Sequence, residues 1–201
     1  MFESHSALAS YRAQPGVESA DGHRALRLGE LAGTHLIQLG VYPGGAARVA
    51  AAVLASLGGG LPDSPVRAAA AGDRLIMRIA PDQYWVVGAE PLLDAQLRNA
   101  VPADAGCVTS LDGARTRLFI EGQAARALLG RLVAIDLHPT IFPIHGFALT
   151  GIHHVGGLLL RVSEDRYEFF ALRTYAASMW EVLIDAARSF GYEIFLSESI
   201  K

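Results

Sequence analysis

The hydrophobic and polar positions of this 201-residue chain follow one pattern that occurs twice. The stretch LIMRIAPDQYWVVG, which begins at Leu75, aligns without gaps with LLLRVSEDRYEFFA, which begins at Leu158, a shift of 83 residues (158 − 75). Upstream, THLIQLG from Thr34 matches TRLFIEG from Thr116, a shift of 82 residues (116 − 34). Because the two shifts agree within one residue, the sequence indicates an internal duplication.

The same secondary structure elements are predicted in both halves. Branched apolar runs closed by glycine predict strands, alanine- and leucine-rich runs predict helices, and paired apolar runs around a short polar turn predict hairpins. The first half then contains a strand at 35–39, a helix at 45–57, a hairpin turning at Pro81–Asp82, a helix at 90–100 and a strand from 107. The second half contains a strand at 117–121, a helix at 123–135, a hairpin turning at Glu164–Asp165, a helix at 174–190 and a strand from 192.

The last of these helices shows the clearest apolar stripe. Thr174 is expected to cap its first turn, because a side-chain oxygen there can accept a main-chain N–H. One face of the helix is apolar at helical spacing. The stripe consists of Met179, Trp180, Leu183, Ala186 and Phe190.

Each half therefore has the order β-α-β-β-α-β, with room for an extra strand before the hairpin. This order predicts an α+β fold made of duplicated ferredoxin-like halves. No linker-like run separates the halves, so we expect one domain over residues 25–201, with pseudo-repeats at about 25–111 and 112–198. Residues 1–24 are expected to form an N-terminal extension.

The composition narrows the class of protein. Hydrophobic residues make up 51% and charged residues 18% of the chain, and the mean hydropathy of +0.29 is high. This excess predicts either a large core or a surface covered by a partner. The net charge of −3 gives no electrostatic footprint for nucleic acid, and no apolar run reaches the length of a membrane span. The N-terminus lacks the pattern of a secretion signal, and Cys107 is the single cysteine, so a cytoplasmic location is expected.

Candidate chemistry is sparse. The glycines of LGGGLPD (57–63) lack the spacing of a nucleotide-binding loop. Cys107, beside Val108 on a predicted strand, is expected to be a small core residue. His153 and His154 are adjacent, so on a strand they point to opposite faces and do not form a joint metal site. No catalytic residue, cofactor-binding residue or metal ligand is predicted.

Several residues remain candidates for contact with a partner or an anion. Arg78 and Arg161 occupy equivalent strand positions, where they are either paired anion contacts or solvated and salt-bridged residues. Arg173 precedes a predicted helix N-terminus, where anions can dock. Trp85, in the aromatic hairpin, belongs either to the core or to an interface.

A proline-rich segment, IDLHPTIFPIHG (135–146), concentrates two histidines. Its counterpart in the first half, LGGGLPDSPVRA (57–68), also contains two prolines but no histidine. The duplicated plan therefore requires a stiff connection at this place and does not require the histidines. Asp136 or His138 is expected to cap chain ends or to contact a partner.

A Gly-x-x-Ala-x-x-Leu-Leu run and five further motifs follow one another in the second half of the chain. They fall at Gly122–Leu129, Asp136–Pro139, Phe142–Pro143, Arg173–Tyr175, Trp180 and Phe190–Gly191. Through these motifs the chain resembles the gamma subunit of heterotetrameric sarcosine oxidases, from about residue 67 to the C-terminus and most clearly after Val108.

The resemblance implies a non-catalytic structural subunit of a flavoenzyme complex that oxidises sarcosine to glycine. In that family FAD, FMN, NAD and tetrahydrofolate belong to the larger alpha and beta subunits and a zinc site to the delta subunit, so those three subunits are the expected partners. The duplicated plan is also similar to the folate-binding domain of the aminomethyltransferases of glycine cleavage.

Two alternatives remain open. The chain is either a subunit of the complex or a stand-alone folate or one-carbon binding module, in which Asp112 or Asp136 would contact the pterin. Within the first class, the parent complex acts on sarcosine or on another N-methyl amino acid.

Overall fold

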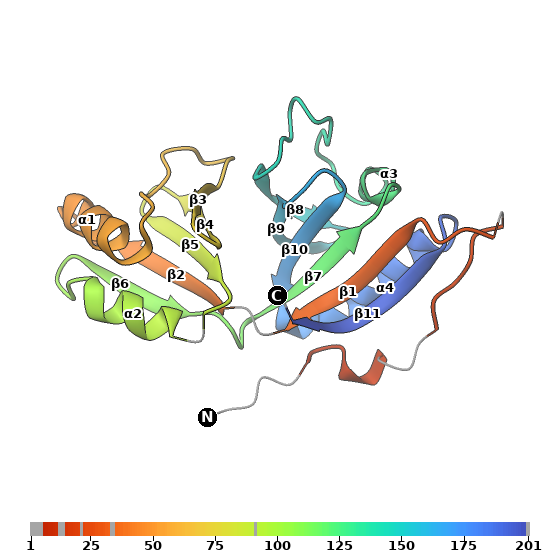
Figure 1. Cartoon of the computed structure of the whole chain (residues 1–201), viewed down its shortest axis with the longest axis horizontal. Helices are drawn as coiled ribbons and strands as arrows, with labels where there is room; N and C mark the ends of the chain where they lie inside the picture. Colours follow the sequence, from red (N-terminus) through yellow and green to blue (C-terminus); the bar gives the residue numbers. More distant parts are fainter. Residues whose placement is uncertain (1–5, 12–14, 21, 33–34, 91, 200–201) are drawn as a thin grey trace. The chain divides into compact units, whose positions relative to one another are not determined.

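The chain forms two compact units (Figure 1). The smaller unit comprises Gly33–Asp112, and the larger unit comprises Met1–Ala32 together with Gly113–Lys201. The structure is a computed structural model that describes residues 6–11, 15–20, 22–32, 35–90 and 92–199. Most of the predicted N-terminal extension is among these residues, whereas its residues 1–5, 12–14 and 21 lie outside the described part.

The smaller unit is one antiparallel sheet with two helices. Its elements are β2 (His35–Val41), α1 (Ala46–Leu57), β3 (Ala69–Ala71), β4 (Arg74–Ala80), β5 (Gln83–Gly88), α2 (Leu93–Ala100) and β6 (Gly106–Ser110). The strands lie in the order β3-β4-β5-β2-β6. Both helices pack on one face of the sheet (Figure 1), and the core between them includes Ile37, Val53, Val86, Leu93 and Leu97.

The larger unit is a second, six-stranded sheet. Its elements are η1 (Ala9–Tyr11), β1 (Leu26–Ala32), β7 (Arg115–Glu121), α3 (Ala125–Leu129), β8 (Phe147–Ile152), β9 (Val155–Arg161), β10 (Arg166–Leu172), η2 (Arg173–Tyr175), α4 (Ala176–Ala187) and β11 (Tyr192–Ser199). The order is β11-β1-β7-β10-β9-β8, in which only β1 and β11 are parallel. Helix α4 packs its predicted apolar stripe into the core, with Met179, Trp180 and Leu183 at most 1% exposed.

The two sheets confirm the duplicated α+β plan. In each, a strand, a helix, an extra strand, a hairpin, a helix and a last strand follow one another, so β3 and β8 are the extra strands that the sequence left room for. The sheets differ at one place. In the smaller unit the first strand pairs directly with the last (β2 with β6), whereas in the larger unit β1 lies between the first and last strands (β7 and β11). The predicted repeat boundaries stay a prediction.

The start of the chain contributes to the core of the larger unit. Leu8 is fully buried, and the carboxylate of Glu30, 6% exposed, accepts hydrogen bonds from the residues around it. The main-chain N–H groups of Ala7 (3.1 Å) and Leu8 (3.3 Å), the hydroxyl of Thr116 (2.8 Å) and the hydroxyl of Ser6 all donate to it. These bonds satisfy a buried carboxylate and hold residues 6–8 against the sheet.

Two predictions about helices are wrong. The helix predicted at 123–135 ends at Leu129, where Gly130 closes it and the main-chain N–H groups of Leu132 and Val133 both bond the carbonyl of Leu129. Glycine weakens a helix through its backbone freedom, and the irregular segment that follows buries Val133 in the core. Thr174 does not cap α4, because it lies within the short turn η2 and no side chain caps the helix start.

Candidate functional site

The proline-rich segment 135–146 folds as a braced turn. The Asp136 carboxylate accepts the main-chain N–H of His138 at 2.8 Å, and the carbonyl of His138 in turn accepts the N–H groups of Ile141 and Phe142. The His138 ring is exposed and its Nδ1 lies 2.8 Å from the hydroxyl of Thr140. Asp136 therefore caps a local turn, one of the two roles expected for it, and the His138 imidazole remains at the surface.

Arg161 fastens this segment to the hairpin that follows it. Its side chain is 5% exposed, and it donates to the carbonyls of Phe142 (2.9 Å), Ser163 (3.2 Å) and Glu164 (2.9 Å). The segment and the turn of the next hairpin are thus joined through one buried guanidinium.

Arg78 makes the same connection in the smaller unit. It donates to the carbonyl of Asp63 (3.1 Å), in the counterpart segment, and to that of Pro81 (3.0 Å), in the hairpin turn. Both guanidinium groups therefore bind main-chain carbonyls, Arg161 in a buried setting and Arg78 in a partly exposed one, so the solvated interpretation fails for Arg161 alone. The shared connection supports the duplication independently of sequence identity.

The three candidate contact residues lie in different settings. Arg173 is half-buried in η2, and its main-chain N–H donates to the carbonyl of Ala114 at 3.0 Å. Trp85, on β5 of the smaller unit, is 3% exposed, and its indole N–H donates to the side chain of Gln38 at 3.2 Å. His138 is the most accessible of the three. Trp85 belongs to the smaller unit, whereas His138 and Arg173 belong to the larger one.

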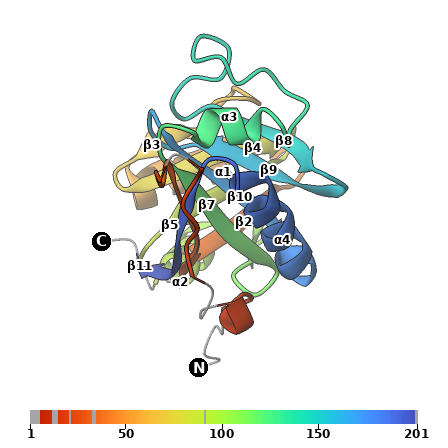
Figure 2. The ribbon, with the colours of Figure 1, turned by 90° about the vertical axis from the view of Figure 1, so that its right-hand side faces the viewer.

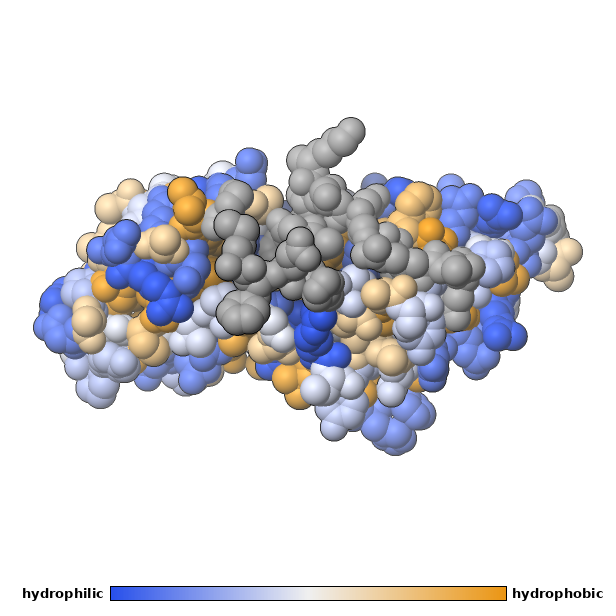
Figure 3. Space-filling view, turned by 90° about the horizontal axis from the view of Figure 1, so that it is seen from below, coloured by the Kyte–Doolittle hydropathy of each residue, from blue (hydrophilic) through white to orange (hydrophobic). Residues whose placement is uncertain are grey.

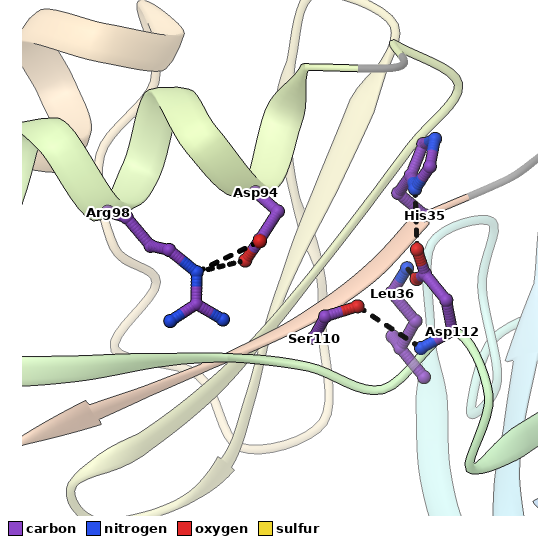
Figure 4. Close-up of polar contacts among 6 residues, drawn as sticks. All are labelled: His35, Leu36, Asp94, Arg98, Ser110 and Asp112. Atoms are coloured by element: carbon purple, nitrogen blue, oxygen red, sulfur yellow. Dashed lines mark hydrogen bonds and ion pairs between the residues drawn. The ribbon is translucent and has the colours of Figure 1, made fainter. Parts of the chain in front are cut away.

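His35, which sequence reasoning missed, meets Asp112, one of the two carboxylates considered as pterin contacts, at one end of the smaller unit (Figure 4). His35, at the start of β2, directs Nδ1 to Asp112 Oδ2 at 2.6 Å, while Asp112 Oδ1 accepts the main-chain N–H of Leu36 at 2.8 Å. The residues are 77 positions apart, so only the register of β2 against β6, which aligns Ile37 with Ser110, predicts their contact.

Such a pair can orient an imidazole as a general base, but it needs a nucleophile to act. Among the described residues, neither a serine nor a cysteine side chain hydrogen-bonds to His35. The pair instead ties the start of β2 to Asp112, two residues beyond the end of β6. The nearby ion pair between Asp94 and Arg98, on the exposed surface of α2, is a helix i,i+4 contact that raises the pKa of Arg98 (Figure 4).

Cys107 is exposed, and the prediction that it lies in the core is wrong. Side chains alternate along a strand, so Val108, 9% exposed, takes the core position of β6 and its neighbour faces outward. A hydrogen bond with the Cys107 thiol raises the pKa of the Tyr42 hydroxyl. No histidine side chain hydrogen-bonds to this thiol among the described residues.

The adjacent histidines form a turn instead of a strand. His153 and His154 connect β8 to β9, and their ring centroids are 4.0 Å apart. The prediction that they point to opposite faces of a strand is therefore wrong, because the hairpin turns at these residues. No group of three or more histidine, cysteine, aspartate or glutamate side chains within the described ranges is placed to hold a metal ion.

A buried ion network lies on the face of the larger sheet opposite α4. Glu168, 2% exposed, pairs with Arg117 at 2.5 Å and with Arg166 at 3.6 Å, and Arg166 also reaches Glu121 at 3.2 Å. The guanidinium of Arg166 stacks over Phe119, 4.7 Å from the ring centroid. The carboxylates offset the charge of the arginines, so this network reads as structural and not as an open anion site.

Two shallow hollows lie beside α4, and both are open to solvent. One open hollow runs along α4, where Val182 and Ala186 alternate with Glu181 and Asp185. On the face shown in Figure 3, hydrophobic and hydrophilic residues are interspersed. No helix in the described part of the chain is long and apolar enough to cross a membrane.

Comparison with known proteins identifies the family. A model of the sarcosine oxidase, gamma subunit family matches residues 44–189, which is most of the chain. The chain belongs to this family. The sarcosine oxidase subunit gamma of Corynebacterium sp. (strain U-96) is 30% identical over 173 residues, covering 84% of this chain and 82% of the relative. The corresponding Arthrobacter subunit is 28% identical over 168 residues, covering 83% of this chain and 82% of its own length.

Solved structures support this family assignment. A chain of the heterotetrameric sarcosine oxidase from Corynebacterium sp. U-96, solved with pyrrole 2-carboxylate, has a TM-score of 0.81 at 29% identity and covers 92% of this chain and 96% of its own. The glycine cleavage aminomethyltransferase T of Bartonella henselae has a TM-score of 0.60 at 16% identity, covering 87% of this chain and 48% of its own. The second likeness confirms the predicted similarity of fold and shows the fold alone.

Proposed function

We propose that this chain is a non-catalytic structural subunit of a heterotetrameric, sarcosine oxidase-type flavoenzyme that oxidatively demethylates sarcosine to glycine. The observation that carries the proposal is the match to the gamma subunit family over most of the chain. The described residues support it, because they bring together no nucleophile, base and orienting group. A subunit of this kind contributes packing surface, and the reaction takes place on other chains.

The proposed partners are the alpha, beta and delta subunits of the complex. FAD, FMN, NAD and tetrahydrofolate are assigned to those partners, and the assembly to the cytoplasm. Arg173, His138 and Trp85 are the proposed contact residues, of which the exposed His138 is best placed to meet a partner directly. Trp85 is only 3% exposed, so we propose that it acts indirectly: its packing holds strand β5 in place for a contact with a partner.

Co-expression tests this proposal. The chain is produced alone, and together with alpha, beta and delta subunits of a sarcosine oxidase, and sarcosine-dependent oxygen consumption is measured for each preparation. We expect the isolated chain to be silent and the four-subunit complex to be active. Omitting this chain should lower the yield of assembled complex. Turnover of sarcosine by the purified single chain would refute the structural role.

The substrate of the complex is tested on a panel of N-methylated amino acids. Sarcosine is expected to have the highest kcat/KM of the panel. A higher value for another N-methyl amino acid would keep the subunit role and change the substrate, because the substrate contacts lie on a partner chain.

Folate binding by this chain alone is the competing function, since the aminomethyltransferase fold is shared. Both candidate carboxylates are already engaged, Asp112 with His35 and the N–H of Leu36, and Asp136 with the N–H of His138. Calorimetric titration of the isolated chain with tetrahydrofolate is therefore expected to give no heat of binding. Saturable heat that Asp112→Asn abolishes would establish the folate module instead.

A further inference from the structure

We propose that the free edge of strand β8 binds an extended segment of a partner subunit, which adds one more strand to the six-stranded sheet. This inference rests on the proposed role of the chain within a complex. It assigns the subunit contact to Phe147–Ile152 and to the braced segment that leads into this strand.

Within the described part of the chain, strand β8 is the outermost strand of its sheet and pairs with β9 alone (Figure 2). The main-chain bond from Arg161 N–H to the carbonyl of Gly146 sets the ladder, and bonded pairs then recur at every second residue. Phe147, Leu149 and Gly151 fall between those pairs, so their N–H and C=O groups point away from β9. These groups are suited to the main chain of an added strand.

Each of the other sheet edges lacks a feature that β8 has. Strand β3 has three residues, and the start of β11 is covered by Val17, which exchanges two main-chain hydrogen bonds with Tyr192. Strand β6 also contains neither a charge nor a proline, but it exposes only the small side chains of Cys107, Thr109 and Ser110 and so offers no large apolar contact.

Strand β8 has six residues in unbroken register with β9, and its sequence, FALTGI, contains neither a charge nor a proline. Folded proteins blunt exposed edges with charges, prolines, bulges or short strands, because a regular edge pairs with other chains. An edge left open in this way fits a strand that is bound in the assembled complex.

Exposed apolar side chains lie on and just before the same strand. Leu149 is 59% exposed on β8, while Ile141 and Ile144, in the segment that precedes it, are 65% and 45% exposed. The Asp136 cap and the Arg161 bond to the carbonyl of Phe142 hold this segment in place, so its side chains are presented at little entropic cost.

Both halves have an exposed apolar residue before the extra strand, but only the second half has a long extra strand. Val66 precedes β3 by three residues and is 62% exposed, just as Ile144 precedes β8 by three residues. Strand β3 is half as long as β8, so only β8 offers a ladder long enough to bind a strand.

These observations define the chemistry of the occupant. Its main chain is extended, and the side chain that packs against Leu149 is apolar and uncharged, because a charge there would be desolvated without a counter-ion. No titratable side chain lies on β8 itself. An acidic or basic tail is thereby disfavoured, and a strand rich in branched apolar residues is favoured.

Hydrogen exchange, read residue by residue, tests the ladder. The amides of Leu149 and Gly151 are compared in the isolated chain and in the four-subunit complex. We expect them to exchange at least about tenfold more slowly in the complex, because they gain acceptors there. The amides of Ala148 and Thr150, already bonded to β9, serve as the internal reference. A complex in which the amides of Leu149 and Gly151 stay fast overturns the inference and leaves the proposed function intact, whereas failure to form any complex refutes the proposed function itself.

Substitutions test the apolar contact. Leu149→Lys is expected to weaken assembly about tenfold or more, whereas Leu54→Lys, at a similarly exposed site (56%) on α1, should leave it unchanged. Gly151→Pro removes an outward N–H without touching the β9 ladder, and a Cβ there meets nothing closer than 3.5 Å, so it should weaken assembly while the isolated chain still folds. If Leu149→Lys and Gly151→Pro assemble as well as the control Leu54→Lys, no partner strand binds this edge. The same conclusion follows if the isolated chain dimerises and the amide of Leu149 already exchanges slowly in that dimer.

Discussion

The buried hydroxyl of Tyr167 makes this residue a sensitive site for a conservative change. The side chain is fully buried, and its hydroxyl has no hydrogen-bond partner within the described part of the chain. Tyr167→Phe removes this unsatisfied group while keeping the ring. We expect the free energy of unfolding, measured in urea, to stay level or to rise by about 1 kcal/mol. Tyr11→Phe is the control, because the Tyr11 hydroxyl donates to Glu181 at 2.7 Å at the surface and nothing buried is relieved.

The same residue predicts a response to alkaline pH. Burial raises the pKa of Tyr167 above its ordinary value of 10.0. The folded state therefore keeps its proton longer than the unfolded state, so the contribution is complete below pH 10 and is lost as the pH rises through the folded-state pKa. Unfolding midpoints measured from pH 8 to 11 should fall less steeply for Tyr167→Phe than for the parent. Identical slopes would contradict the assigned burial effect.

Arg161 and Arg78 each connect a hairpin turn to the segment before it, but Arg161 is buried and Arg78 is partly exposed. The free energy of unfolding lost on substitution should therefore differ between them. Arg161→Met leaves the carbonyls of Phe142 and Glu164 without a buried donor, which is expected to cost roughly 3 kcal/mol of unfolding free energy. Arg78→Met frees carbonyls that water can reach, and about 1 kcal/mol or less is expected. Denaturant unfolding of both variants measures the difference. Equal losses would mean that burial does not set the strength of the connection.

At the scale of elements, local signals were predicted well and non-local ones were not. Both hairpins turn where Pro81–Asp82 and Glu164–Asp165 predicted, and α1 ends at Gly58, which adopts the left-handed conformation (φ 72°) that favours glycine. The helix predicted at 123–135 is too long, because the same spacing of apolar residues also suits an irregular buried segment. The prediction for Cys107 was wrong because alternation divides the residues of β6 between two faces without showing which face the helices cover.

The N-terminal segment is an element that the sequence did not assign to the core. Its attachment depends on Glu30, since Ala7, Leu8 and Thr116 donate to that carboxylate. Glu30→Gln replaces one acceptor oxygen by an N–H₂ group that faces donors, so roughly 2 kcal/mol of unfolding free energy should be lost. Limited proteolysis should also release the first residues sooner. Glu18→Gln, at an exposed ion pair, is the matched control and should change neither reading.

At the scale of the whole molecule, the duplication was visible in the sequence and the position of β1 was not. The two shifts of 83 and 82 residues mark equivalent strands because side-chain alternation is a local property. Strand β1 pairs with β7 and with β11, which lie far along the chain, and no local pattern specifies those partners. The same limit applies to the His35–Asp112 contact, since it arises from strand register. The candidate contact residues were chosen by type, and the sequence could not tell the exposed His138 from the buried Trp85.

The membership of β1 in the larger unit predicts how the chain opens. Val53, on α1, is fully buried in the core of the smaller unit, and Val53→Ala should destabilise that unit by about 2 kcal/mol. Because each unit has its own core, hydrogen exchange should accelerate at the amides of β2, β4 and β5, which belong to the smaller unit. The amides of β1 precede β2 directly in sequence, yet they bond β7 and β11, so their exchange should stay slow. The reciprocal change, Leu118→Ala in β7, should accelerate β1 and spare β2. If β1 instead follows β2 in both variants, the strand opens with its neighbour in sequence, and the division of the chain into these two units does not describe its stability.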